Sequence, residues 1–502
     1  MAGLVISFAM NPVWTLLSAF AGAVVVLLLP SRAAGASRWI ALFATVVGAI
    51  AALLGCLAKL GGGESWEWNA SWIPSMGARF HLAANGLSLS LLLLTGIVAV
   101  AGVLFSWNVE RRPRAFFAAF LTIIGGSYGV FLSRDALLLF VFYEIVILPK
   151  YLLISIWGST RREYGAMKLT MYSIGGSALI LIGLCTAYAA SGGKGFGLLE
   201  LVQGPYSPAL QSWAFPVLFL GFAVLAGMWP FHTWAPTGHV AAPTAASMLL
   251  AGVVMKLGAY GALCVAMPLF PQGFEQWKPV IAGLAVIGIL HGALTALVQK
   301  DLKFVIGYSS VSHMGFILLG LAAGTHWGFR GAVLQMVSHG IISGLLFGIA
   351  GRTVYERTHT RDLAELGEFN LWKSLPGASL AFTLASAASM GLPGFSGFVA
   401  EISVIIGVWS VYPWAALLVV VGIMVTGAFS LRALQKGFSG TRGVDSSRRE
   451  ASLLPAMTWA ELVAIGLLTL SSLGIGLYPR PWVSLIDDGL RSSLFQTILQ
   501  KP

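Results

Sequence analysis

The chain alternates between long apolar runs and short polar connections. Runs of about 20 predominantly apolar residues are long enough to cross a bilayer as helices. The sequence contains fourteen such runs, centred near residues 21, 48, 95, 123, 147, 180, 221, 255, 288, 313, 340, 390, 424 and 466. The pattern therefore predicts an all-α polytopic membrane protein with about 14 transmembrane helices, numbered here from 1 to 14 along the chain.

Composition and charge agree with this prediction. Of the 502 residues, 57% are hydrophobic and only 10% are charged, against about 25% charged residues in soluble chains. The loops after helices 1, 3, 5, 9, 11 and 13 carry 18 Lys and Arg, and the opposite side carries 9. The positive-inside rule makes the richer side cytoplasmic and places both termini outside. The net charge of +11 then needs no nucleic-acid partner, because the basic loops are expected to meet anionic lipid or partner subunits.

Two proline-containing stretches predict breaks in helices 7 and 12. They are GMWPFHTWAPTGHVAAPTAAS at 227–247 and MGLPGFSG at 390–397. Proline removes a backbone donor, and freed backbone groups at depth need protein or a water-filled cavity. Paired broken helices are typical of transporter repeats. The predicted organisation is helices 1–3 at 1–110, a first five-helix repeat (helices 4–8) at 111–268, a second (helices 9–13) at 277–440, and helix 14 with a short tail at 450–502.

Three charged residues lie inside apolar runs. They are Glu144 in helix 5, Lys256 in helix 8 and Glu401 just after the break in helix 12. An ionised group at the bilayer centre costs about 3 kcal/mol on insertion scales, so such residues usually have a partner or a function. A buried lysine binds its proton less tightly and can release and rebind it. Proton transfer is the favoured interpretation, and a static Lys256–Glu144 ion pair is the alternative.

Histidines at depth add to this set. His291, His313 and His339 lie in the neighbouring helices 9, 10 and 11, and histidine titrates near neutrality. They are predicted to extend the proton path, although a hydrogen-bonded core histidine is the alternative. No two have i, i+4 spacing, so no metal site is predicted. Lys150 follows Glu144 by six residues, about 240° round a helix, and is expected to reach an interface.

Several motifs together resemble one family. FVFYEIVILPKYLLISIWG, PFHTWAPTGHVAAPTAAS, QKDLKFVIGYSSVSHMGFIL, MVSHGIISGLLF with YERTHTRDL, and GLPGFSGFVAEISVIIG are similar to the M-type antiporter-like subunit of respiratory complex I, the proton-pumping NADH:quinone oxidoreductase. The resemblance covers roughly residues 85 to 440. Glu401 and YERTHTRD resemble the M type, because its L- and N-type relatives carry lysine in the slot of Glu401. The resemblance implies two inverted five-helix repeats with broken helices 7 and 12, and ionisable residues running along the membrane plane.

The resemblance also implies roles for particular residues. It makes Glu144, Lys256, His313, His339 and Glu401 members of the family's proton path, with His232 of PFHTW and His239 as possible accessory groups. Two positions depart from the family pattern. Leu225 replaces a lysine seven residues before His232, and Thr237 replaces an aspartate. Glu144 would thus lack its usual ion-pair partner, and Lys150 is the candidate for a displaced cation.

The leading hypothesis is a proton-translocating subunit driven by redox chemistry in other chains. No haem, iron–sulfur or nucleotide-binding spacing occurs, so this chain is expected to hold no cofactor and no redox centre, and to act only as part of an oxidoreductase. The alternatives are a subunit of a multisubunit cation/proton antiporter or membrane-bound hydrogenase, or a structural M-type subunit with lost or altered pumping. The expected partners are L-, N- and K-type membrane subunits and lipid, in a bacterial-type inner (cytoplasmic) membrane.

Overall fold

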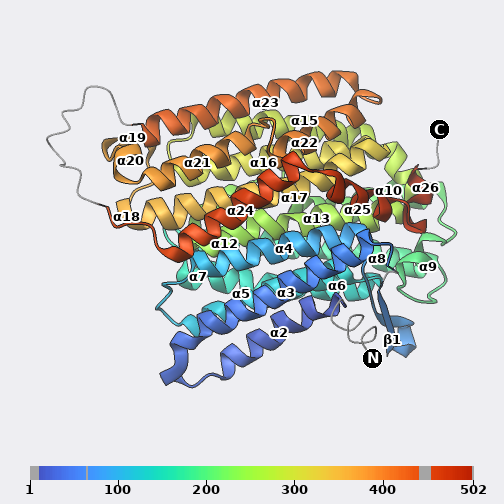
Figure 1. Cartoon of the computed structure of the whole chain (residues 1–502). Helices are drawn as coiled ribbons and strands as arrows, with labels where there is room; N and C mark the ends of the chain where they lie inside the picture. Colours follow the sequence, from blue (N-terminus) through green and yellow to red (C-terminus); the bar gives the residue numbers. More distant parts are fainter. Residues whose placement is uncertain (1–10, 64–65, 440–453, 500–502) are drawn as a thin grey trace.

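The computed structural model describes residues 11–63, 66–439 and 454–499, and shows one bundle of long helices lying side by side (Figure 1). In the described residues, 12 helices are long and apolar enough to cross a membrane. The shorter apolar helix α2 and the interrupted pair α21 and α22 add two more crossings. The predicted all-α membrane fold is therefore confirmed.

The crossings follow the order of the chain. The first seven are α2 (Val13–Leu28), α3 (Ser37–Leu60), α4 (Gly86–Phe105), α5 (Pro113–Leu132), α6 (Ala136–Ile145) with α7 (Ile147–Trp157), α8 (Arg162–Ala190), and α10 (Pro208–Ala226) with α11 (Trp234–Ala241). The last seven are α12 (Thr244–Leu249) with α13 (Met255–Gly261) and α14 (Met267–Leu269), α15 (Pro271–Val298), α16 (Leu302–Ala322), α17 (His326–Gly348) with α18 (Glu356–Thr358), α21 (Pro376–Ser389) with α22 (Ser396–Trp409), α23 (Pro413–Ala433) and α24 (Trp459–Leu477).

Short elements cover the two ends of the bundle. Near one end, which we call the basic end, lie α19 (Leu363–Glu368) and α20 (Leu371–Ser374), beside the loops rich in Lys and Arg. At the other end, called the hairpin end, strands β1 (Glu67–Ile73) and β2 (Ala78–Ala83) pair antiparallel near α9 (Leu198–Val202), α25 (Arg480–Leu490) and α26 (Gln496–Leu499) (Figure 1). The hairpin was not predicted from the sequence, because hydropathy identifies spans and carries little information on their connections.

Both predicted helix breaks are present. In the seventh crossing, α10 ends at Ala226 and α11 begins at Trp234, with Gly227 at a φ of 76° between them. In the twelfth, α21 and α22 are separated by residues 390–395, where Gly391 and Gly394 have φ of 68° and 98°. Positive φ is accessible to glycine at little cost, which explains why these residues stand where the helices stop.

Crossings 8 and 11 form the centre of the bundle, and their most apolar windows are completely buried. Two glycines let them approach closely: a Cβ on Gly252 would lie 3.2 Å from the Gly340 carbonyl oxygen, and a Cβ on Gly340 would lie 2.6 Å from that of Gly252. Close approach of backbones at small residues is typical of membrane helices. Crossing 8 is also π-helical at Leu250–Val254 and Ala262–Ala266, on both sides of α13.

Candidate functional site

Lys256 lies in the centre of the bundle, on α13. Its side chain is completely buried, with 0% exposure. The ammonium Nζ lies 2.7 Å from Nδ1 of His339 on α17, and it also donates to the carbonyl of Ala251. An ammonium can only donate, so Nδ1 of His339 accepts when Lys256 is charged. This contact allows one proton to pass between the lysine and the imidazole.

His339 is followed by His313 on α16. The two rings are stacked, with centroids 5.3 Å apart and planes 21° from parallel. Nε2 of His339 is buried and has no hydrogen-bond partner in the described part of the chain. That nitrogen is therefore free to take up or release a proton toward its neighbour.

His313 joins the histidines to the broken twelfth crossing. Its Nδ1 lies 2.9 Å from the carbonyl oxygen of Ser309, and its Nε2 lies 3.2 Å from that of Ser389, the last residue of α21. Carbonyl oxygens only accept hydrogen bonds, so each contact forms when the ring nitrogen concerned carries a proton. Nε2 also lies 3.8 Å from Oε1 of Glu401.

Glu401 ends this series, on α22. Only 5% of its surface is exposed, and its carboxylate lies over the backbone of the break. A Cβ added to Gly391 would overlap Oε2 of Glu401. The bare glycine therefore provides the space that the carboxylate occupies.

Four predicted residues thus form a contiguous series across crossings 8, 11, 10 and 12. We call Lys256, His339, His313 and Glu401 the central relay. Its order in space differs from its order in the sequence. The sequence identified the members, and the structure supplies their order.

Glu144 lies apart from this contiguous series, at the C-terminal end of α6. Its side chain is partly buried, and one carboxylate oxygen, Oε1, is buried without a hydrogen-bond partner in the described chain. No described cation lies within 4.0 Å of its carboxylate. The static Lys256–Glu144 ion pair considered from the sequence is therefore absent.

The expectation that Lys150 reaches an interface is wrong. Its side chain on α7 is 2% exposed, and Nζ donates to Oγ of Ser173 on α8 over 3.4 Å. The boundary between α6 and α7 falls at Val146, three residues before Pro149. Lys150 and Glu144 form no ion pair.

Leu225 is the residue at which the resemblance implies the loss of a lysine. It lies on α10, is 2% exposed, and belongs to the apolar core. One turn earlier, Phe222 packs edge to face against Tyr143 of α6, with ring centroids 6.0 Å apart. The surface of α10 that faces the Glu144 helix is therefore apolar at this position.

His239 and Lys303 form a second buried polar group, toward the basic end. His239 on α11 is 0% exposed, and neither ring nitrogen has a partner in the described chain. Lys303, at the start of α16, is 3% exposed and donates to the carbonyl of Ala242 over 3.1 Å. Sequence reasoning placed Lys303 with the cytoplasmic loops and missed its burial.

His291 lies apart from the central relay, and its part in a proton path stays a prediction. His291 lies on an exposed face of α15 and contacts the buried ring of His232, with centroids 5.0 Å apart. Periodicity along α15 could not show which face meets the bundle. Thr237, the other departure from the family, receives a hydrogen bond from Lys168 over 3.5 Å.

A line of hydroxyl groups was also missed. The hydroxyl of Ser396 on α22 is hydrogen-bonded to that of Ser338 on α17 over 2.8 Å and to that of Ser472 on α24 over 2.9 Å. Single serines in apolar helices carry no signal of this contact. No group of three or more His, Cys, Asp or Glu in the described residues is placed to hold a metal ion.

The fold and the buried titratable groups define a class: polytopic membrane proteins that carry ionisable side chains across the bundle centre. The sequence profile described as "NADH:quinone oxidoreductase/Mrp antiporter, TM" matches residues 133–426. The chain therefore belongs to this family.

Individual relatives agree with this assignment. The chain is 38% identical over 491 residues to NAD(P)H-quinone oxidoreductase chain 4 1 of Synechococcus sp. (strain JA-3-3Ab), covering 93% of this chain and 91% of the relative. A chain of respiratory complex I from Thermus thermophilus superposes with a TM-score of 0.84 at 27% identity, covering 97% and 99% of the two chains. A chain of the archaeal membrane-bound sulfane sulfur reductase superposes with a TM-score of 0.84 at 23% sequence identity, covering 98% of each chain. This similarity shows that the two chains share a fold.

Proposed function

We propose that this chain is the M-type, proton-translocating subunit of a complex I-type NADH:quinone oxidoreductase. The central relay is the observation that carries the proposal. Four titratable side chains from four helices succeed one another in a region with almost no exposed surface. Burying such groups is costly without a purpose. Proton transfer requires this arrangement, whereas a structural role needs only one pair.

The geometry indicates how protons move. Lys256 passes a proton to Nδ1 of His339 over the 2.7 Å contact. Rotation of the ring or one bridging water carries it to His313, and Nε2 of His313 delivers it to Glu401. A change of charge at one member changes the proton affinity of the next, so motion in a neighbouring subunit can drive the series. Redox chemistry and cofactors belong to other chains in this proposal.

The proposed orientation follows from the charge of the loops. The basic end faces the cytoplasm and the hairpin end faces outward, in the cytoplasmic membrane of a bacterium. In this orientation both termini are external. L-, N- and K-type subunits and lipid are the proposed neighbours. Exposed His291, which contacts the buried ring of His232, lies on a surface that such a neighbour would cover.

Lys256→Met tests the proposal. In the assembled complex, reconstituted in vesicles, we expect fewer protons moved per electron, because methionine preserves the volume and cannot bind a proton. The matched control is Lys278→Met, since Lys278 forms a surface pair with Glu275 over 2.6 Å, outside the relay. An unchanged ratio in Lys256→Met refutes the function. Replacement of Na⁺ by choline separates proton pumping from cation/proton antiport, because only antiport then stops.

A structural M-type subunit with altered pumping is the second candidate. It is favoured by Leu225 and by the unpaired carboxylate of Glu144. It predicts that Glu144→Gln leaves the number of protons per electron unchanged. A fall in this number assigns Glu144 to the working path and removes this candidate.

A further inference from the structure

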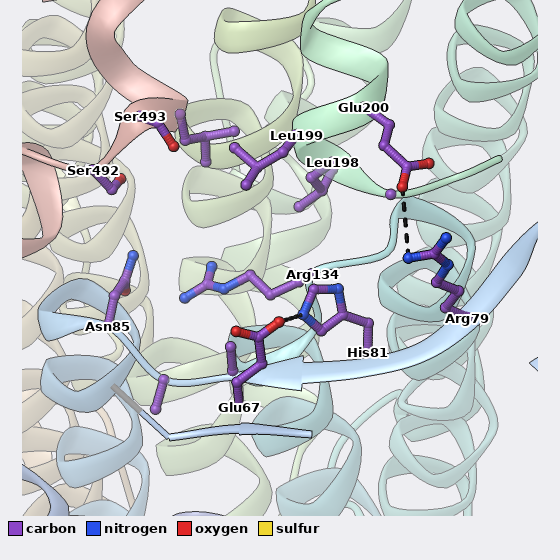
Figure 2. A pocket seen from close by; sticks show the side chains of 14 residues that line it. Glu67, Arg79, His81, Asn85, Arg134, Leu198, Leu199, Glu200, Ser492 and Ser493 are labelled. Carbon is purple, nitrogen blue, oxygen red and sulfur yellow. Dashed lines mark hydrogen bonds and ion pairs between the residues drawn. The ribbon is translucent and has the colours of Figure 1, made fainter. Parts of the chain in front are cut away.

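A partly open cavity of about 290 Å³ lies at the hairpin end, between the β-hairpin, α9 and the segment 492–494 (Figure 2). Five charged or titratable residues line it, namely Glu67, Arg79, His81, Arg134 and Glu200. Two pairs account for four of them: His81 with Glu67 over 2.6 Å, and Arg79 with Glu200 over 3.7 Å. Arg134 is the fifth, and no described carboxylate lies within 4.0 Å of it.

Arg134 is held firmly in the turn between α5 and α6. Its backbone N–H donates to the carbonyl of His81 on β2, and its own carbonyl accepts from Leu198 of α9, both over 2.9 Å. The next residue, Asp135, cannot serve as a counter-ion without losing other contacts, because its carboxylate accepts from the backbone of Arg79, Leu137 and Leu138. Figure 2 shows the Arg134 side chain extending through the middle of the cavity.

Behind Arg134, hydroxyl groups continue toward the relay. Nη2 of Arg134 donates to Oγ of Ser88 over 3.0 Å, and this oxygen lies 3.3 Å from the hydroxyl of Tyr260. Tyr260 lies on α13, four residues after Lys256, so the two side chains occupy the same side of one helix. Ser88 and Tyr260 are buried, with 0% and 1% exposure. The Tyr260 hydroxyl also donates to the carbonyl of Phe131 over 3.0 Å. Hydrogen-bonded polar groups thus extend from the cavity to Tyr260, whose backbone lies one helical turn from that of Lys256.

The guanidinium of Arg134 cannot carry a proton along these polar groups. It remains protonated at any physiological pH and has no acceptor, so it cannot receive and pass on a proton. Its fixed positive charge, without a described counter-ion, repels hydronium and metal cations that enter the cavity. Arginine provides barriers of this kind in other membrane pores.

We propose that Arg134 is an electrostatic barrier that stops protons of the outer side from returning to Lys256 through the cavity, Ser88 and Tyr260. The proposal rests on the proposed function, since it assumes that Lys256 carries protons. Arg134 is a positioning residue in this role: it acts on the direction of transfer and takes no part in the relay. Pumping then retains its yield because protons do not return through this cavity.

The test measures passive proton leak in the complete complex. The complex is reconstituted in vesicles with an internal pH indicator and given an acid jump, without electron donor. Arg134→Met and Arg134→Gln are expected to raise the leak several-fold, and Arg134→Lys to leave it at the wild-type rate. Glutamine keeps a hydrogen-bond donor for Ser88, so Arg134→Gln separates the effect of the lost charge from that of the lost hydrogen bond. It also replaces Arg134→Met as the test if the methionine variant does not assemble. The control is Arg79→Met, a second arginine of the same cavity that has a carboxylate partner, with an expected wild-type rate.

The barrier is overturned if neither neutral variant leaks protons faster than the wild type, or if Arg79→Met leaks as fast as they do. The double variant Arg134→Gln with Lys256→Met gives the decisive check. It is expected to be tight again, because the leak passes through Lys256. A persisting leak means that the packing was damaged and refutes the proposal. Failure of the proposed function is recognised separately, as a wild-type complex that does not move protons during turnover.

Discussion

From Lys256 to Glu401 the polar side chains contact one another across four helices, whereas around Glu144 such contacts are missing. In the central relay, Lys256 Nζ lies 2.7 Å from its histidine and the last histidine lies 3.8 Å from Glu401. On the other side, Glu144 has no cation within 4.0 Å in the described residues, and Lys150 bonds to Ser173. Two regions with similar residue types therefore differ in connectivity, and the surface of α10 that meets the Glu144 helix is apolar at Phe222.

Glu401→Gln is expected to have the largest effect, and it tests whether the central relay and the Glu144 region differ in function. The amide cannot take the proton of His313, so we expect transfer through this subunit to slow by about a hundredfold or more, as when an acid–base group is lost. The number of protons moved per electron, measured in vesicles, reports the effect. Glu275→Gln at the end of α15 is the control. Equal losses in Glu144→Gln and Glu401→Gln would contradict the contrast between the regions.

Leu225→Lys is the second test, because it returns a cation to the surface of α10 that faces the Glu144 helix. We expect the buried ammonium to be tolerated only with Glu144 as its partner. Combining Leu225→Lys with Glu144→Gln should therefore destabilise the subunit by roughly 3 kcal/mol relative to Leu225→Lys alone. The difference is measured by heating the purified complex and using proteolysis of this chain to report the fraction unfolded at each temperature. Equal stability of the two variants shows that the carboxylate is out of reach.

Gly391→Ala sharpens the comparison within the relay. The added Cβ meets a φ of 68° and the carboxylate of Glu401, at an expected cost of about 1–3 kcal/mol. Gly394→Ala is a matched control, since its φ is 98° but its Cβ would have only Leu477 as a neighbour, 3.9 Å away. Both variants should lose stability, and only Gly391→Ala should also lower the protons moved per electron.

Lys150→Met is expected to have the smallest effect. If its ammonium acts as a displaced cation for Glu144, the protons moved per electron fall slightly while assembly is kept. Ser173→Ala, which removes only the hydroxyl that Lys150 contacts, should change neither quantity. A loss as large as that of Glu401→Gln would place Lys150 in the main path.

Hydropathy and proline placement predicted the crossings and both breaks, because these features depend on local composition. The members of the relay could also be predicted, since charge at depth is rare. The face of each helix that meets the bundle could not be predicted. His291 is exposed and Lys303 is buried, and both outcomes depend on how neighbouring helices pack. The burial of Lys150 against Ser173 of α8 likewise depends on how α7 and α8 pack.

The π-helical turns on both sides of α13 determine how crossing 8 responds to a change in its number of residues. Each π turn, at Leu250–Val254 and Ala262–Ala266, accommodates one residue more than an α turn would. Loss of one residue within Leu250–Val254 would turn the π turn into an ordinary α turn, so α13 and Lys256 would keep their orientation. Loss of one residue from the α-helical stretch before it would instead rotate the remaining helix by about 100° and aim Lys256 at a different neighbour. The π turns are therefore the places where crossing 8 can change its length without moving the lysine.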